Sequence, residues 1–203
     1  MSRVKPTSES DLDICLLKKR MRNQIFQAKE AISNEEMLGQ ASQLCSQLER
    51  TDIWSKSKIV LLYSNLSKEI SVNQLIEKGL KSKKVIALPR YDSESRNYTA
   101  CIIRGLKDLV IGRYGVKEPL INCPEINMNQ LDLVIVPGVA FDRIGGRLGR
   151  GGGYYDQILK KLDAISCGVC FREQVVHQTP QELHDVKMDF TMTPDGKLDF
   201  NLI

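Results

Sequence analysis

Residues 134–156 read VIVPGVAFDRIGGRLGRGGGYYD, and this stretch decides the fold that the rest of the sequence supports. Branched apolar residues at 131–136, closed by Pro137 and Gly138, are typical of a strand that is covered on both faces in a parallel sheet. A glycine-rich loop follows, and from Tyr154 the pattern becomes helical. A buried strand, a loop and a helix in this order favour an α/β fold.

The loop has six glycines between Gly145 and Gly153, interrupted by Arg147 and Arg150. Glycines at this density let the backbone take positive φ values and bring its N–H groups close to a ligand. The arginines add planar cationic groups for phosphate oxygens, and the helix that starts at Tyr154 points its positive end at the same place. We therefore expect the loop to bind a polyphosphate.

A flexible linker and an RNA-binding segment are the other functions of a Gly/Arg-rich run. Such segments are usually long and do not lie between an apolar strand and an apolar helix. The loop also lacks the Gly-Lys-Ser/Thr ending of a Walker loop and the glycine spacing of a dinucleotide-binding fingerprint. The residues by themselves therefore indicate a phosphate-binding loop and nothing narrower.

The chain has 203 residues, of which 42% are hydrophobic, and a formal net charge of +4. This length suits one large core, so we expect a single domain over residues 1–203. The charge is spread along the chain, without the basic block of a nucleic-acid-binding arm. No apolar run could cross a bilayer, and the first residues lack the apolar core of a signal peptide. We expect a cytoplasmic, monomeric enzyme that binds small molecules and neither nucleic acid nor membrane.

Helix and strand patterns alternate along the chain. Apolar residues at helical spacing predict a helix over residues 12–32 and another to about residue 50, opened by a capping box of Ser33 and Glu36. Apolar runs predict about six strands, near residues 59–63, 85–91, 98–103, 131–136, 165–171 and 188–193. We expect a three-layer α/β sandwich with a largely parallel central sheet flanked by helices.

The first predicted helix has two candidate faces. Its apolar face is predicted to consist of Ile14, Leu17, Met21, Ile25, Ala28 and Ile32. The cations Lys18, Lys19, Arg20 and Arg22 cluster early in the same helix, and taken alone they indicate a solvated basic face. Six scattered cysteines indicate reduced thiols, and Cys167 and Cys170 have no second CxxC that would complete a zinc site.

Phe141 and Asp142, followed by GRLGRGGGYYD at residues 146–156, resemble the signature of the 5-formyltetrahydrofolate cyclo-ligase (methenyltetrahydrofolate synthetase) family. The resemblance extends from Lys18 to about Thr193. It implies ATP- and magnesium-dependent cyclisation of 5-formyltetrahydrofolate to 5,10-methenyltetrahydrofolate, with release of ADP and phosphate, through a phosphorylated formyl intermediate. A catalytically inactive folate- or nucleotide-binding regulator of the same fold is the alternative.

The resemblance also implies which residues meet ATP and magnesium. Lys18 and Arg22, four residues apart on one helix face, are implied to approach ATP. The other implied ATP-binding residues are Arg147, Leu148, Gly149, Arg150, Gly151, Gly152, Gly153, Tyr154 and Tyr155. The implied Mg²⁺ ligands are Asp156 and Asp185, and the implied catalytic residues are Arg147, Arg150 and Asp156. Some family members have lysine at the position of Gly152, a cation that this chain lacks.

The folate-binding residues are implied in the same way. Glu69, in the loop after the first predicted strand, is implied to bind the pterin ring, where a carboxylate can accept paired hydrogen bonds from a ring N–H and an amino group. Arg90 and Tyr91, at the end of the second predicted strand, and Tyr154 are implied to contact the folate.

Overall fold

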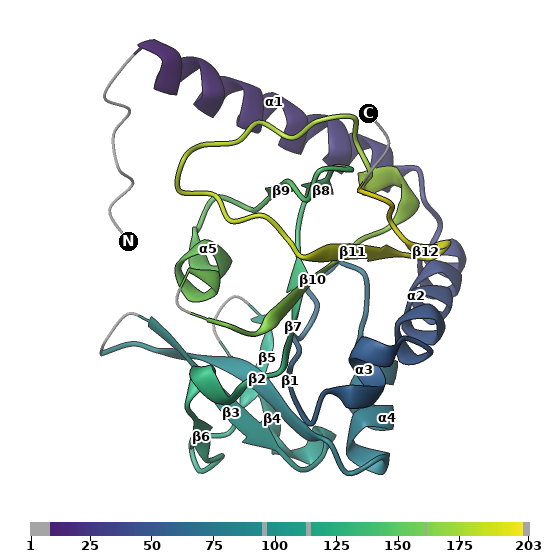
Figure 1. Cartoon of the computed structure of the whole chain (residues 1–203), viewed down its shortest axis with the longest axis vertical. Coiled ribbons are helices and arrows are strands. Elements are labelled where there is room, and N and C mark those ends of the chain that lie inside the picture. The colour runs from purple at the N-terminus through teal and green to yellow at the C-terminus, as the bar shows by residue number, and fades with distance from the viewer. Residues whose placement is uncertain (1–8, 95–96, 113–114, 161, 201–203) are drawn as a thin grey trace.

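The structure is a computed structural model that describes residues 9–94, 97–112, 115–160 and 162–200. Its centre is an eight-stranded sheet with the strand order β12-β11-β10-β7-β1-β2-β3-β6 (Figure 1). The strands of this sheet are β1 Ile59–Leu61, β2 Val85–Asp92, β3 Asn97–Ile103, β6 Glu125–Ile126, β7 Leu133–Pro137, β10 Ile165–Val169, β11 Phe190–Thr193 and β12 Gly196–Lys197. Two small antiparallel pairs lie outside it, β4 Leu109–Ile111 with β5 Lys117–Pro119, and β8 Ala140–Phe141 with β9 Arg147–Leu148.

The five central strands β11, β10, β7, β1 and β2 run parallel, and the edge strands β12, β3 and β6 run antiparallel to their neighbours. The predicted largely parallel sheet is therefore confirmed. The predicted number of about six strands is too low for this sheet, because β6 and β12 have two residues each and leave no hydrophobic period in the sequence.

Helices cover both faces of the sheet (Figure 1). On one face lie α2 Asn34–Glu49, α3 Asp52–Lys56 and α4 Asn73–Lys81, and on the other lies α5 Tyr154–Leu159. The central strands divide their side chains between two cores, so that Val60 and Ile135 pack toward α2 and α4, whereas Leu61 and Val134 pack toward α5. This alternation buries both faces of the parallel strands and produces the predicted sandwich.

The first helix, α1 Glu9–Glu30, packs on the β8–β9 hairpin and the loops beside it. Ile25 is buried against Ala140 and Leu148 of the hairpin. The predicted apolar face is partly wrong, because Leu17 is 49% exposed and Ala28 is also exposed. The buried side of α1 includes lysines instead, because the loops beneath it offer carbonyl and carboxylate oxygens as well as apolar groups.

The first part of the predicted glycine loop forms the β8–β9 hairpin. The buried carboxylate of Asp142 accepts four hydrogen bonds, from the backbone N–H groups of Ile144, Gly146 and Thr179 and from the Thr179 hydroxyl, at 2.7–3.0 Å. A Cβ atom at position 146 would lie 2.2 Å from an Asp142 oxygen, so this turn requires glycine. Asp142 therefore fixes the hairpin, from which the free part of the loop, residues 149–153, departs.

The remaining sequence predictions concern single side chains. Ser33 caps α2 as predicted and accepts a hydrogen bond from the N–H of Glu36 at 3.1 Å. Cys167 and Cys170 are free and fully buried, and burial raises the pKa of both thiols. Both side chains are thus part of the packed interior.

We predict that Asp142→Ala lowers the free energy of unfolding by about 2–4 kcal/mol, because it leaves buried N–H and O–H donors without an acceptor. Equilibrium urea denaturation measures this change. The matched control is Asp163→Ala at an exposed position, for which a change within about 0.5 kcal/mol is expected. Equal stability of the two variants would contradict the anchoring role of Asp142.

Candidate functional site

Four segments that are distant in sequence meet around residues 149–156: α1, the turn after β1, the glycine loop after the β8–β9 hairpin, and residues 181–186. The turn follows the carboxyl end of β1, and the loop lies beyond the carboxyl end of β7. These two strands are neighbours in the sheet. The chain proceeds from β1 to β2 on one side and from β7 to β10 on the other. Ligands of open α/β sheets bind at this kind of switch point.

Arg150 in the glycine loop pairs with Glu69 in the turn after β1. The Arg150 Nε atom lies 2.7 Å from Glu69 Oε1, and the other carboxylate oxygen accepts the backbone N–H of Leu66 at 2.8 Å. The Glu69 side chain is 9% exposed, whereas Arg150 is largely in solvent. The structure thus joins a residue implied to bind ATP with one implied to bind folate.

Arg147 lies behind the loop rather than on its surface. Its side chain is 4% exposed, and it donates to Asp156 Oδ1 at 2.8 Å. The guanidinium also lies 5.8 Å from the ring centre of Tyr155. The resemblance implied that Arg147 binds ATP. In the structure, Arg147 instead contacts Asp156 and orients its carboxylate.

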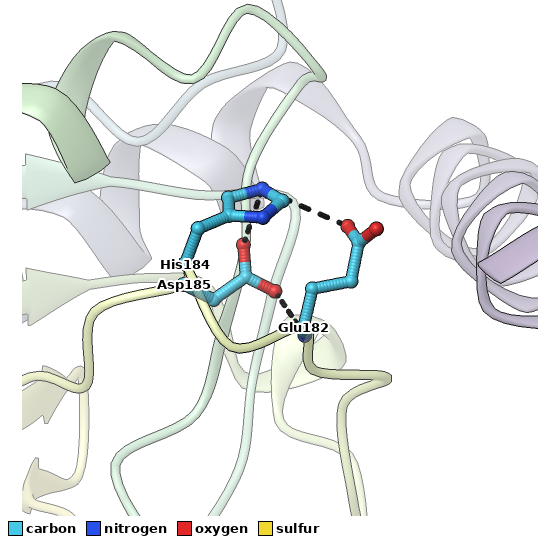
Figure 2. Close-up of side chains that lie close together, drawn as sticks. All are labelled: Glu182, His184 and Asp185. Carbon is cyan, nitrogen blue, oxygen red and sulfur yellow. Dashed lines mark hydrogen bonds and ion pairs between the residues drawn. The ribbon is translucent and has the colours of Figure 1, made fainter. Parts of the chain in front are cut away.

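Lys18 enters the site from α1 and pairs with two carboxylates. Its ammonium lies 2.6 Å from Glu182 Oε2 and 2.6 Å from Asp185 Oδ2, and the residue is buried. The expectation of a solvated basic face is therefore wrong for Lys18. Figure 2 shows Asp185 folded back toward the N–H of Glu182, with the exposed His184 ring 3.7 Å from both carboxylates.

The oxygen and nitrogen atoms of Glu182, His184 and Asp185 lie close enough to one another to hold an ion (Figure 2). The Lys18 ammonium donates to both carboxylates and offsets one of their two negative charges, so this trio is better described as a binding place for that ammonium. Magnesium fits the carboxylate chemistry of Asp185 and Asp156 better, because it prefers oxygen ligands. Asp156 Oδ1 accepts the N–H of Val186, the residue after Asp185, at 3.3 Å.

The free part of the loop presents backbone groups to solvent. Arg22 Nε donates to the carbonyl of Gly149 at 2.8 Å, which joins α1 to the loop. Gly151 and Gly153 have φ values of 102° and 64°, conformations that side chains rarely adopt, whereas Gly152 has open space around it. Because α5 has only six residues, the loop amides are better phosphate donors than its dipole.

Leu148, also implied to bind ATP, has its side chain buried under α1. Its carbonyl accepts the N–H of Val139 at 2.7 Å within the hairpin. The Leu148 side chain is therefore not accessible to a ligand, whereas the loop residues Gly151 and Gly152 are exposed.

Tyr91 and Arg90 point in opposite directions, since neighbouring residues of a strand alternate between its faces. Tyr91 contacts the ring of Tyr98 on β3, and Tyr98 contacts Tyr154 with ring centres 4.1 Å apart. Arg90 donates instead to backbone carbonyls at residues 120, 121 and 123 and pairs with Glu125. The structure brings Tyr91 toward the glycine loop but does not bring Arg90 there.

Tyr154 has a buried hydroxyl that forms no hydrogen bond with any residue described by the structure. Burial raises its pKa, so the phenol stays neutral and can donate to a ligand. Tyr155 contacts Tyr154 with ring centres 4.9 Å apart and packs with the core beneath α5. Tyr154 is thus the better placed of the two for a ligand contact.

Three residues near the site were not predicted from the sequence. Tyr98 and Glu182 had no recognisable signal, because their contacts depend on pairing between distant segments. Lys29 donates to the carbonyl of Lys68 at 2.8 Å, beside Glu69. Its position, on the same helix face as Lys18 and Arg22, was a signal that helical spacing could have provided.

The sequence profile of the 5-formyltetrahydrofolate cyclo-ligase family matches residues 16–194. The chain is 26% identical over 191 residues to a 5-formyltetrahydrofolate cyclo-ligase of Mus musculus, covering 88% of this chain and 94% of the mouse protein. It is 30% identical over 209 residues to the 5-formyltetrahydrofolate cyclo-ligase of Saccharomyces cerevisiae, covering 89% and 97%. A solved structure of Aquifex aeolicus 5,10-methenyltetrahydrofolate synthetase has a TM-score of 0.82 and 29% identity, covering 92% and 94%. The chain belongs to the 5-formyltetrahydrofolate cyclo-ligase family.

Proposed function

We propose that this protein is an ATP- and magnesium-dependent enzyme that closes 5-formyltetrahydrofolate to 5,10-methenyltetrahydrofolate, releasing ADP and phosphate. Membership of the family supports the reaction. One observation supports the proposal for this site: three ion pairs meet around the glycine loop. In each pair, a cation implied to bind ATP contacts a carboxylate implied to bind magnesium or folate.

The nucleotide is bound by the loop amides of residues 151–153 and by the cations around them. Arg150 is largely exposed and can turn from Glu69 to a phosphate oxygen. Lys18 and Arg22 approach from the same face of α1. Phosphoryl transfer mainly requires this kind of positioning and charge neutralisation, with little covalent chemistry from the protein.

Asp156 and Asp185 would hold magnesium, which when bound neutralises the charge on the phosphate oxygens. Arg147 keeps Asp156 in place through their buried ion pair. With Asp185 holding magnesium, Glu182 would remain as the carboxylate partner of the Lys18 ammonium. The protein thereby avoids leaving a buried charge unpaired.

The chemistry follows from the poor leaving-group character of the formamide oxygen. That oxygen attacks the γ-phosphorus of ATP, the bond from this phosphorus to the bridging oxygen of ADP breaks, and an iminium phosphate forms. N10 of the folate then attacks the formyl carbon and loses its proton to solvent, and phosphate departs with the electrons of the C–O bond. Glu69 would accept hydrogen bonds from the pterin ring. Tyr154, whose ring packs against Tyr98, would form one wall of the folate site.

The protein's size and location are also part of the proposal. No helix in the part of the chain that the structure describes is long and apolar enough to span a bilayer. We propose a monomeric, single-domain enzyme of the cytoplasm.

The proposal is tested by incubating the purified protein with 5-formyltetrahydrofolate and following the near-ultraviolet absorbance of methenyltetrahydrofolate. Product is expected only when ATP and magnesium are both present, and chelation of magnesium should stop the reaction. A folded protein that binds ATP but forms no product would instead support the alternative, a folate- or nucleotide-binding regulator.

We predict that Asp185→Asn and Asp156→Asn both lower kcat by at least about 100-fold, because each removes a magnesium ligand. The variants should differ in stability. Asp156→Asn leaves the buried Arg147 without its carboxylate, at a cost of about 3–5 kcal/mol, whereas Asp185→Asn leaves Lys18 paired with Glu182 and costs less than about 2 kcal/mol. The measurements are steady-state turnover and urea denaturation.

Asp163→Asn, at an exposed position, is the control and should retain normal turnover and stability. Normal turnover in Asp185→Asn would remove Asp185 from the proposed magnesium site.

Gly152→Lys should lower the KM for ATP by roughly threefold to tenfold, since it adds an exposed cation beside the phosphates. Nothing lies within 4 Å of a Cβ atom at position 152, and its φ is not in the positive region, so lysine fits without strain. Gly151→Lys is the contrasting variant, because its φ of 102° disfavours any side chain and the loop should be disturbed. If Gly152→Lys raised the KM for ATP, the phosphates would not lie beside this residue.

A further inference from the structure

Lys29 is a buried cation that has no role in the proposed reaction. It lies seven residues after Arg22 and eleven after Lys18, which places all three on one side of α1. Its side chain is buried, and within the described ranges it forms no ion pair with a carboxylate. Its ammonium donates to the backbone carbonyl of Lys68 at 2.8 Å.

Lys68 has an unusual backbone conformation. Its φ is 62°, and it is the third residue of a tight turn closed by a hydrogen bond from the N–H of Glu69 to the carbonyl of Leu66, 3.1 Å long. Glycine or asparagine usually takes a positive φ at this position, because a longer side chain crowds the backbone. A lysine here persists only where neighbouring contacts hold it.

The peptide group between Lys68 and Glu69 is held on both sides. Its N–H donates to Leu66, and its carbonyl accepts from Lys29. The Glu69 carboxylate returns to the same turn and accepts the N–H of Leu66 at 2.8 Å. Rotation of this peptide would therefore turn the Glu69 side chain away from Arg150. Lys29 resists this rotation at the peptide itself, whereas Arg150 and Glu30 hold the side chains of Glu69 and Lys68 from outside the turn.

The charges around Lys29 agree with this arrangement. Burial and the Arg150 guanidinium lower the pKa of Lys29, and the Glu69 carboxylate raises it. A buried ammonium is costly unless hydrogen bonds and opposite charge compensate it. The Lys68 carbonyl and the Glu69 carboxylate supply that compensation, so Lys29 and Glu69 stabilise each other.

We propose that Lys29 is a positioning residue for the folate: its ammonium locks the Lys68–Glu69 peptide and thereby sets the direction in which the Glu69 carboxylate meets the pterin ring. The inference rests on the proposed function, in which Glu69 binds the folate. The hydrogen bond of Lys29 goes to this turn, so the folate step depends on it more strongly than the nucleotide step, in which Arg150 leaves Glu69 for a phosphate oxygen.

The test is the steady-state kinetics of Lys29→Met, with 5-formyltetrahydrofolate and ATP varied separately. The KM for the folate should rise about tenfold, the value of one well-placed hydrogen bond, whereas kcat and the KM for ATP should change by less than about twofold. Lys19→Met is the matched control, because it makes the same change at an exposed position of α1 and should leave all three constants unchanged.

A second variant separates positioning from a general effect on folding. Lys68→Gly removes the strain of the positive φ, so the double variant Lys29→Met with Lys68→Gly should recover about half or more of the lost folate affinity on a logarithmic scale. Lys68→Gly alone should behave like the unaltered protein. If Lys29→Met acted only by destabilising the protein, the added Lys68→Gly substitution would not restore folate affinity.

An unchanged folate KM in folded Lys29→Met, or equal rises in both KM values, would overturn the inference. If Lys29→Met does not fold, Lys29→Gln is judged by the same criteria. Failure of the unaltered protein to turn over 5-formyltetrahydrofolate would instead refute the proposed function, so the two failures are distinguishable.

Discussion

Pairing of opposite charges around the glycine loop is the interaction on which the site depends. Lys18 pairs with Glu182 and Asp185, Arg147 with Asp156, and Arg150 with Glu69. Each pair includes a side chain that is at most 9% exposed, and a charge so shielded from water is costly when it loses its partner. The Lys18 and Arg150 pairs therefore fix the distance between segments that are far apart in sequence, and the Arg147–Asp156 pair fixes the two ends of the glycine loop. Apolar burial builds the sheet and its two cores, whereas charge holds α1, the loop and residues 181–186 together.

The same pairs allow charged ligands to enter the proposed site at low cost. A phosphate oxygen can replace Glu69 as the partner of Arg150, while ring N–H groups of a pterin replace Arg150 on Glu69. The buried Arg147 remains with Asp156 and does not need to move. On binding, Arg150 and Glu69 each exchange one partner for another, and no charge is left unpaired. More of the binding energy is then available to stabilise the transition state.

The scaffold under this site depends on buried polar groups at defined positions. Asp142 collects four hydrogen bonds that shape the hairpin from which the loop departs. Lys29 holds the strained peptide before Glu69. Because α1 supplies Lys18, Arg22 and Lys29 from one face, a small rotation of this helix would disturb the contacts at both the loop and the turn.

The sequence by itself determined the α/β class, the six longer strands, the capped α2 and the glycine loop between β7 and α5, because these depend on local hydrophobic period and glycine content. It also named, through the family motif, most of the residues that meet at the loop. Only the tertiary structure decided that α1 turns Lys18 and Lys29 inward, that Arg90 faces away while Tyr91 faces the loop, and that Arg147 lies buried behind Asp156. These outcomes depend on which distant segment each side chain meets, and the pattern of neighbouring residues along a chain carries no record of such long-range pairing.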